Sequence, residues 1–299
     1  MSSGIRFAKG HGTENDFVVL PDPDGALDLT PARVAALCDR RRGLGADGVL
    51  RVVRWAAAGA GAPAPEPGVE WFMDYRNGDG SVAEMCGNGV RVFARHLALD
   101  GLLPDGTGEH VIGTRGGVRT VRFAGGDGAG GEVSVGMGLA KVGAESTATV
   151  RGHAYAGVAV DVGNPHLACV TTTDIAGLDL DVPPGHDPAL FPHGVNVEFV
   201  TPVTGGDGDA EVSMRVHERG VGETRSCGTG TVAAVVAALR QAGRESGDVR
   251  VGTPGGRLRV TVEPDGTTVL HGPAVVLARG ELDRAWWDGL DSGPVTHNG

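Results

Sequence analysis

The chain has 299 residues, 40 % of them hydrophobic, and a formal net charge of −11 at pH 7. This length allows one large domain or two of about 150 residues, and the acidic charge disfavours nucleic acid or an anionic membrane surface as a partner. No apolar run is long enough to span a membrane, and no signal peptide is recognisable. Four cysteines in such a chain indicate reduced thiols, so we expect a cytoplasmic protein.

The first part of the chain alternates short strand patterns with one short helix pattern. A helix is predicted after the cap Thr30-Pro31, and the glycine-rich stretch 43–48 is a tight turn, because it lacks the Gly-Lys-Ser/Thr ending of a phosphate loop. Residues 56–68, rich in Ala, Gly and Pro, are expected to form a surface loop. Strands are predicted at 5–7, 17–20, 49–53, 69–75 and 118–123.

The second part repeats this order. The glycine-rich segment 124–131 is either a hairpin tip or a domain linker. After it, strands are predicted near 132–137, 156–162, 166–170, 196–200, 211–216, 257–262, 268–271 and 274–277, with one long helix that stops at Gly243.

Each half is therefore mostly strands around one long helix, which predicts an α/β (α+β) architecture with mixed or antiparallel sheets. We expect two similar domains, 1–124 and 132–273. The remaining segment, 274–299, is expected to form a closing strand and tail that returns to the N-terminal domain.

The long helix of each half opens on the same turn, Cys-Gly-x-Gly, at 86–89 and again at 227–230. Apolar residues then recur at the i, i+3, i+4, i+7 spacing of a buried helix face. Cys86 and Cys227 are thus expected at helix N-termini, where free N–H groups and the helix dipole lower the pKa of a thiol and hold a carboxylate. Two such turns facing each other would form a pocket with one thiol on each side.

These cysteines have three other interpretations. Each could be a small buried hydrophobic residue, or the two could form a disulfide, although a disulfide is unusual in a cytosol. A zinc site would have to be assembled in three dimensions from Cys86, Cys227, His11 and His166, because the chain has no Cys-x-x-Cys or His-x-x-x-His pair. The matched turns and helices favour a functional pair, and we expect no bound metal.

Several polar residues stand at turns or strand edges. Turn propensity alone accounts well for Asn77 and Asn88, and less well for Asn164, which lies in an Asn-Pro-His sequence between two strands. The pair Glu218-Arg219 precedes a glycine-rich turn and is either a solvated ion pair or part of a binding site. The asparagines at such positions are Asn15, Asn77, Asn88, Asn164 and Asn196.

Read together, these stretches resemble the diaminopimelate epimerase family. The order and spacing of the matching segments hold from about residue 5 to residue 240. Two positions depart from the pattern: many relatives have Leu-Gly in place of Thr13-Glu14, and some have a substrate-contacting Gln in place of Gly48. The matching segments are 11–18, 43–48, 77–81, 85–91, 163–166, 191–192, 195–197, 218–224 and 227–230.

The resemblance implies two similar domains, each a β-barrel-like sheet around a central helix, with the active site between them, in a homodimer. It implies interconversion of LL- and meso-2,6-diaminopimelate, a small-molecule substrate, without a cofactor, on the route to lysine and peptidoglycan. It makes Cys86 the proton donor and Cys227 the proton acceptor, with His166 and Glu218 supporting catalysis. The substrate-binding residues that it implies are Asn15, Asn77, Gly87, Asn88, Asn164, Asn196, Glu218, Arg219, Gly228 and Thr229.

The residue chemistry is compatible with this resemblance. Inversion at an α-carbon without pyridoxal phosphate needs two groups on opposite faces, one to take a proton and one to give one. Only Lys9 and Lys141 could form a Schiff base, and neither lies in a glycine-rich active-site motif. The alternatives are a proline-type racemase of the same fold and an amino-acid-binding protein without catalysis; Glu218-Arg219 and the asparagines favour a substrate with a second amino-acid centre.

Overall fold

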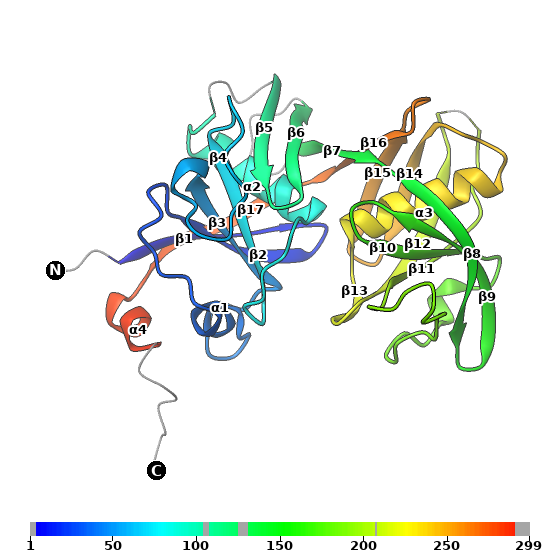
Figure 1. The fold of residues 1–299 in the computed structure, drawn as a ribbon, viewed down its shortest axis with the longest axis horizontal. Coiled ribbons are helices and arrows are strands. Elements are labelled where there is room, and N and C mark those ends of the chain that lie inside the picture. The colour runs from blue at the N-terminus through cyan, green and yellow to red at the C-terminus, as the bar shows by residue number, and fades with distance from the viewer. Residues whose placement is uncertain (1–3, 104–107, 125–130, 207, 291–299) are drawn as a thin grey trace, which may run out of the picture. The chain divides into compact units, whose positions relative to one another are not determined.

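The computed structural model describes residues 4–103, 108–124, 131–206 and 208–290 (Figure 1). Most of the segment expected to be a hairpin tip or linker, 125–130, and the last part of the tail, 291–299, lie outside the described residues. The chain divides into two compact units. The first comprises Met1–Gly12, Asp16–Val133 and Ala274–Gly299, and the second comprises Thr13–Asn15 and Ser134–Pro273.

Strands predominate, as the sequence predicts, and four α-helices are described: α1 (Pro31–Cys38), α2 (Gly87–Leu99), α3 (Gly228–Gln241) and α4 (Arg284–Gly289). Two short 3-10 turns are η1 (Trp55–Ala57) and η2 (Ile175–Gly177). The first strands are β1 (Ile5–Gly12), β2 (Asn15–Pro21), β3 (Gly48–Arg54), β4 (Trp71–Asn77), β5 (Gly108–Thr114), β6 (Gly117–Ala124), β7 (Glu132–Leu139) and β8 (Lys141–Val150). The later strands are β9 (His153–Asp161), β10 (Pro165–Val170), β11 (Asn196–Val200), β12 (Glu211–Glu218), β13 (Gly222–Thr224), β14 (Gly247–Thr253), β15 (Gly256–Val262), β16 (Thr267–Pro273) and β17 (Val275–Leu282).

The same order of strand pairings occurs in both units. In the first, β2 is parallel to β3, β3 antiparallel to β4, β4 parallel to β5 and β5 antiparallel to β6. In the second, β10, β11, β12, β14 and β15 follow one another with the same alternation of directions. A parallel pair needs a crossover connection, and α2 and α3 supply it at the same step of the two series.

These two crossover helices form the centres of their units. Helix α2 contacts β1, β3, β4 and β17, whereas α3 contacts β9 to β12 and β14 to β16. Figure 1 shows α3 lying among the strands of the second unit. Both helices are buried over nearly their whole length, because strands cover them on several sides.

The C-terminal segment belongs with the first unit. Strand β17 is antiparallel to β1, with Leu282 opposite Ile5. In α4, Trp287 is 2 % exposed and packs in the same core as Val34 and Leu37 of α1, and the Arg33 guanidinium lies 5.0 Å from its ring centre. Both ends of the chain therefore contribute to the unit that carries Cys86.

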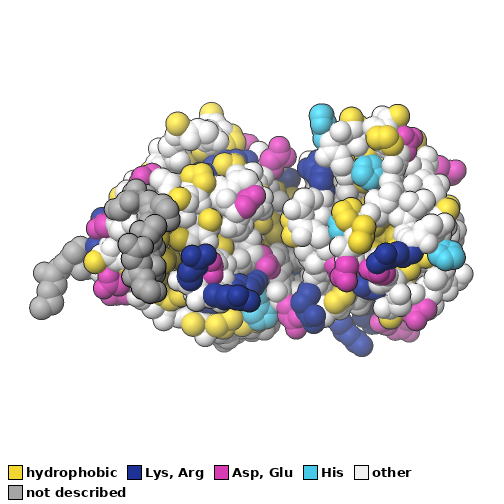
Figure 2. Space-filling view, turned by 90° about the horizontal axis from the view of Figure 1, so that it is seen from below, with side chains coloured by type: hydrophobic (Ala, Val, Ile, Leu, Met, Phe, Trp, Pro, Cys, Tyr) yellow, Lys and Arg dark blue, Asp and Glu magenta, His cyan; other side chains and the backbone are white. Residues whose placement is uncertain are grey.

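Surface charges are mixed. Figure 2 shows acidic and basic side chains interspersed over the face in view. None of the helices in the described part of the chain is long and apolar enough to cross a membrane.

Candidate active site

The first turn of α2 lies over one edge of the sheet in the first unit. Gly48 begins β3 and pairs with Asn77, the last residue of β4. A Cβ added to Gly89, in the first turn of α2, would lie 3.2 Å from Leu50 and 3.6 Å from Phe17. The strand ends and the helix N-terminus of this unit therefore meet at the same edge, where the Asn77 amide donates to the Ser81 hydroxyl at 3.0 Å.

Cys86 is the N-cap of α2, the position that the sequence predicts. Its Sγ accepts a hydrogen bond from the Gly89 N–H at 3.4 Å, and the side chain is half-buried. Gly87 and Asn88 are the first two helical residues, so their N–H groups lack intrahelical partners.

A buried cation lies one helical turn further on. Arg91 is fully buried and donates to the Asn88 side-chain oxygen at 2.7 Å and to the Gly87 carbonyl at 3.3 Å. Burial lowers the pKa of Arg91 to about 10, while negative charge on Cys86 and Glu132 favours the charged guanidinium.

The second unit places its polar residues at the corresponding edge. Asn164 precedes β10, Asn196 begins β11 and Glu218 ends β12, and His166 pairs with Asn196. The Asn196 side chain bridges the strands: it donates to the Pro165 carbonyl and accepts from the Arg219 N–H, both at 3.0 Å. The Glu218 carboxylate accepts from the Thr224 hydroxyl.

Cys227 is the N-cap of α3 and is 7 % exposed. Its Sγ accepts from the Gly230 N–H at 3.4 Å and lies 3.6 Å from the Thr229 hydroxyl. Burial raises the pKa of Cys227 well above its usual value, the charges of Glu218 and Glu198 raise it further, and the contacts with Thr229 and Gly230 oppose the rise. The expected lowering by the helix N-terminus is therefore outweighed, because a thiolate here would be both desolvated and close to two carboxylates.

Glu198, which the sequence reading passed over, lies beneath this turn. The side chain is fully buried, and its Oε1 lies 2.7 Å from the Nδ1 of His166, whose Nε2 lies 3.0 Å from the Asn164 side-chain oxygen. Burial raises the pKa of Glu198 to about 7, partly offset by His166. The signal was one acidic residue inside the otherwise apolar strand 197–200, a position where an unpaired charge is costly.

Asn15 follows a strained turn between β1 and β2. Thr13 and Glu14 have positive φ angles, 55° and 62°, which a two-residue hairpin turn normally reserves for Asn-Gly. Glycine would adopt the φ angle of position 14 without this strain. The turn residues Thr13–Asn15 belong to the second unit, in which the Thr13 carbonyl lies against Gly255 and Glu14 forms an ion pair with Arg225.

Gly48, the other departure from the family pattern, has no room for a side chain on this backbone. A Cβ at this position would lie 2.5 Å from the Arg76 carbonyl oxygen and 2.7 Å from the Tyr75 ring. Position 48 therefore offers only backbone groups to a ligand.

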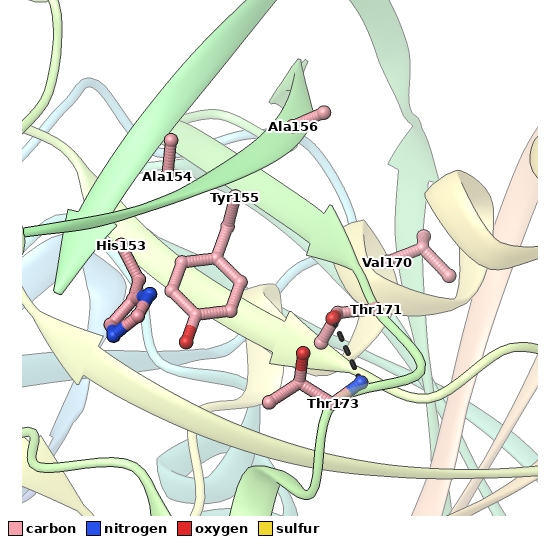
Figure 3. Close-up of a pocket in the computed structure, with 7 residues that line it drawn as sticks. All are labelled: His153, Ala154, Tyr155, Ala156, Val170, Thr171 and Thr173. Carbon is pink, nitrogen blue, oxygen red and sulfur yellow. Dashed lines mark hydrogen bonds between the residues drawn. The ribbon is translucent and has the colours of Figure 1, made fainter.

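A separate hollow of about 320 Å³ lies between β9, β10 and the residues after β10 (Figure 3). Its lining includes Tyr155, Val170 and Thr171, whose hydroxyl accepts from the Thr173 N–H at 3.1 Å. Val170 is the last residue of β10, whereas His166 is near its start, about 13 Å away along an extended strand. The hollow is thus at the opposite end of the strand from Cys227's neighbours.

The chain is similar to known proteins over nearly its whole length. The family model described as diaminopimelate epimerase matches residues 7–142 and 158–277, which extends the similarity beyond residue 240. The chain is 57 % identical over 293 residues to diaminopimelate epimerase of Rhodococcus jostii (strain RHA1), covering 95 % of this chain and 99 % of the relative. It is 58 % identical over 291 residues to that of Mycolicibacterium smegmatis (strain ATCC 700084), covering 94 % and 98 %.

Solved structures share the fold at low sequence identity. A hydroxyproline epimerase from Agrobacterium vitis has a TM-score of 0.65 at 15 % identity, with 96 % of this chain and 95 % of that chain covered. A phenazine biosynthesis protein of the PhzF family from Bacillus anthracis has a TM-score of 0.64 at 14 % identity, with 95 % and 100 % covered. The mixed α/β fold is that of these proteins, and the chain belongs to the diaminopimelate epimerase family.

Proposed function

We propose that this chain is a cofactor-independent isomerase that interconverts LL- and meso-2,6-diaminopimelate, in the biosynthesis of lysine and peptidoglycan precursors. The observation that carries the proposal is the 57 % identity to diaminopimelate epimerase of Rhodococcus jostii over 95 % of the chain. The cysteine N-caps of the two equivalent helices support it, because each offers one thiol at a helix N-terminus.

In the proposed mechanism the two compact units act as two domains, and each supplies one thiol to the same α-carbon. For LL to meso conversion, the Cys227 thiolate takes the α-proton, and the electron pair of the broken C–H bond is delocalised into the α-carboxylate. The Cys86 thiol then gives its proton to the opposite face, so that Cys227 ends as a thiol and Cys86 as a thiolate. The reverse reaction exchanges these roles.

The α-carboxylate is proposed to accept hydrogen bonds from the N–H groups of Gly87 and Asn88 in α2 and of Gly228 and Thr229 in α3. Each helix dipole contributes only about 0.3–2 kcal/mol to binding an anion. Enzymes lower barriers by about 8–23 kcal/mol, so most of the effect must come from positioning the thiols in a site that excludes water.

The distal amino-acid centre of the substrate carries a carboxylate and an ammonium group, so it needs both a positively and a negatively charged partner. We assign the carboxylate and ammonium of that centre to Arg219 and Glu218, which match them in charge, and His166 to a supporting role beside Cys227. Amide side chains can donate and accept, which suits either group. The amides proposed for this end are Asn15, Asn77, Asn164 and Asn196. A cytoplasmic homodimer acting on this small molecule, with no cofactor, completes the proposal.

Exchange at the α-carbon tests the proposal directly. In heavy water, the purified protein should incorporate deuterium at the α-carbon of LL-diaminopimelate while the meso isomer forms. Cys86→Ala and Cys227→Ala should each lower turnover at least about 10³-fold, because neither proton transfer has a substitute. Cys169→Ala, which removes a thiol from the core of the second unit, serves as the control and should retain turnover.

Other outcomes would reject this function. Near-parent turnover in either active-site variant would exclude the two-thiol mechanism. Exchange on proline or hydroxyproline, but not on diaminopimelate, would favour a proline-type racemase. Binding of diaminopimelate without any exchange would favour an amino-acid-binding protein.

A further inference from the structure

The two repeats differ sharply in what lies beneath their cysteine turns. In the first unit, Phe17 of β2 and Leu50 of β3 lie beneath Gly89. The strand registers are equivalent in the two units, because Phe17 pairs with Gly48 as His166 pairs with Asn196. The counterpart of Phe17 is therefore His166 of β10. The counterpart of Leu50, two residues after Gly48, is Glu198 of β11, two residues after Asn196. The two positions that carry apolar residues in the first unit therefore carry ionisable residues in the second.

The fold does not require this ionisable pair. Phe17 and Leu50 are fully buried and fill the equivalent positions with apolar groups alone. Burying two ionisable groups costs several kcal/mol of desolvation per ion, and well-packed apolar residues in their place are often neutral or stabilising. A role in the chemistry of Cys227 accounts for a pair that stability alone does not favour.

Hydrogen-bond geometry fixes how many protons the pair holds. The Nε2 of His166 faces the Asn164 side-chain oxygen, so Nε2 carries a proton and donates it. The contact of 2.7 Å between Nδ1 and the Glu198 Oε1 then needs one further proton, on either atom. In both arrangements the pair has no net charge, and loss of that proton leaves one negative charge in the core.

We propose that Glu198 is a positioning residue for Cys227: with His166 it holds one proton beneath the first turn of α3, and this proton permits Cys227 to become a thiolate. The carboxylate is close to the turn, because a Cβ on Gly230 would lie 2.6 Å from Glu198 Oε1 and 3.3 Å from Cys227 Sγ. If the pair lost its proton, its charge would oppose the thiolate as the charge of Glu218 does.

The carboxylates that act on Cys227 come from two strands, Glu198 of β11 and Glu218 of β12, and His166 of β10 contacts Glu198. Cys86 instead has the buried cation Arg91 on its own helix. The two thiols thus differ in electrostatic setting although their turns match. The Glu198–His166 proton limits the negative charge that a Cys227 thiolate would face.

This inference rests on the proposed role of Cys227 as a proton acceptor, but a thiol titration tests it without epimerase activity. In a Cys86→Ala background, the rate of iodoacetamide alkylation of Cys227 is followed against pH, with the modified peptide identified by mass spectrometry. Glu198→Gln keeps the shape, can donate to Nδ1, and cannot lose the proton. The parent pair can lose its proton as the pH rises above about 7, whereas the Glu198→Gln pair stays uncharged. The midpoint for Cys227 should therefore fall by about one pH unit, with faster alkylation above neutral pH.

Glu263→Gln is the matched control, because it removes one exposed carboxylate from the same unit and should leave the midpoint unchanged. If the Cys227 midpoint in Glu198→Gln lies within about 0.3 pH units of the parent's midpoint, the inference is overturned. If the midpoint shifts but the parent enzyme exchanges no α-proton, the proposed function fails and the role of Glu198 stands.

A double variant separates this role from a structural one. His166→Phe with Glu198→Leu copies the apolar pair of the first unit into the second. It should unfold at the parent's temperature or above. Its epimerisation kcat should fall at least about tenfold, because apolar side chains solvate a Cys227 thiolate less well than the protonated pair does, while KM changes less, because the substrate-binding groups remain. Retention of kcat in a folded double variant would make the pair structural and overturn the inference.

Discussion

Asp74 of β4 shows how strongly one buried residue can contribute to the first unit. Its side chain is 1 % exposed and accepts hydrogen bonds from Arg76 and Arg115, both at 2.8 Å, with Arg51 at 3.6 Å. Burial raises the pKa of Asp74, but the hydrogen bonds and charges of Arg76 and Arg115 outweigh burial and lower it. Arg51 also has Asp22 at 2.6 Å, so Asp74 matters most to Arg76 and Arg115.

We predict that Asp74→Asn lowers the free energy of unfolding by about 3–5 kcal/mol, because it removes the partly buried counter-charge of Arg76 and Arg115. Because the folded-state pKa is below the unfolded value, this stabilisation is present above the unfolded pKa and is lost as the pH falls through the folded pKa. Urea unfolding at pH 7 and near pH 3 should show a difference between variant and parent that shrinks in acid. Asp24→Asn removes an 80 % exposed carboxylate and should cost less than about 1 kcal/mol; equal costs in the two variants would contradict the prediction.

At the scale of elements, the matched first turns of α2 and α3 give a direct comparison. Gly89 and Gly230 occupy the same helical position, but a Cβ would meet Leu50 at 3.2 Å in one case and the Glu198 carboxylate at 2.6 Å in the other. That carboxylate cannot move aside easily, since it is fully buried and bonded to His166.

We therefore predict unequal costs for the same substitution. Gly230→Ala should destabilise the protein by about 1–3 kcal/mol through overpacking. Gly89→Ala should change stability by less than about 1 kcal/mol, because alanine's helix propensity offsets a mild contact. Thermal unfolding of both variants measures the difference, and a larger loss for Gly89→Ala would show that Glu198 does not restrict the turn.

At the scale of the whole molecule, the first unit is built from both ends of the chain. Its core joins Ile5 of β1 to Leu282 of β17 and Trp287 of α4. All four tryptophans of the sequence lie in this unit, whereas Cys169 is buried in the second. Tryptophan fluorescence and the protection of Cys169 from alkylation therefore report on different units.

A C-terminal substitution should accordingly weaken the unit that carries Cys86. Leu282→Ala should lower the unfolding free energy seen by tryptophan fluorescence by about 2–4 kcal/mol, because it leaves a cavity in the core. The urea concentration that exposes Cys169 should not change. Leu277→Ala, in the same strand but 57 % exposed, is the control and should shift neither transition. Equal shifts of both probes would mean that the units unfold as one.

Local sequence signals predicted the elements whose causes are themselves local. The helix 31–38 begins as predicted because Pro31 is its first residue and the Thr30 hydroxyl accepts from the Arg33 N–H. The two Cys-Gly-x-Gly turns cap helices because the apolar stripe behind each one is unbroken. The sequence does not predict strand β8, since most of its residues are exposed and it lacks the alternation that marks a half-buried strand.

The sequence by itself therefore determined the family, the mixed α/β class, the two cysteine-capped helices and the asparagines at strand edges, since each depends on neighbours in the chain. Only the tertiary structure decided what lies beneath each turn: Phe17 and Leu50 under Cys86, but His166 and Glu198 under Cys227. It also shows that burial raises the pKa of Cys227, whereas the helix N-terminus alone would lower it. Burial and through-space charge depend on strands that are distant in sequence, and no local pattern encodes their sum.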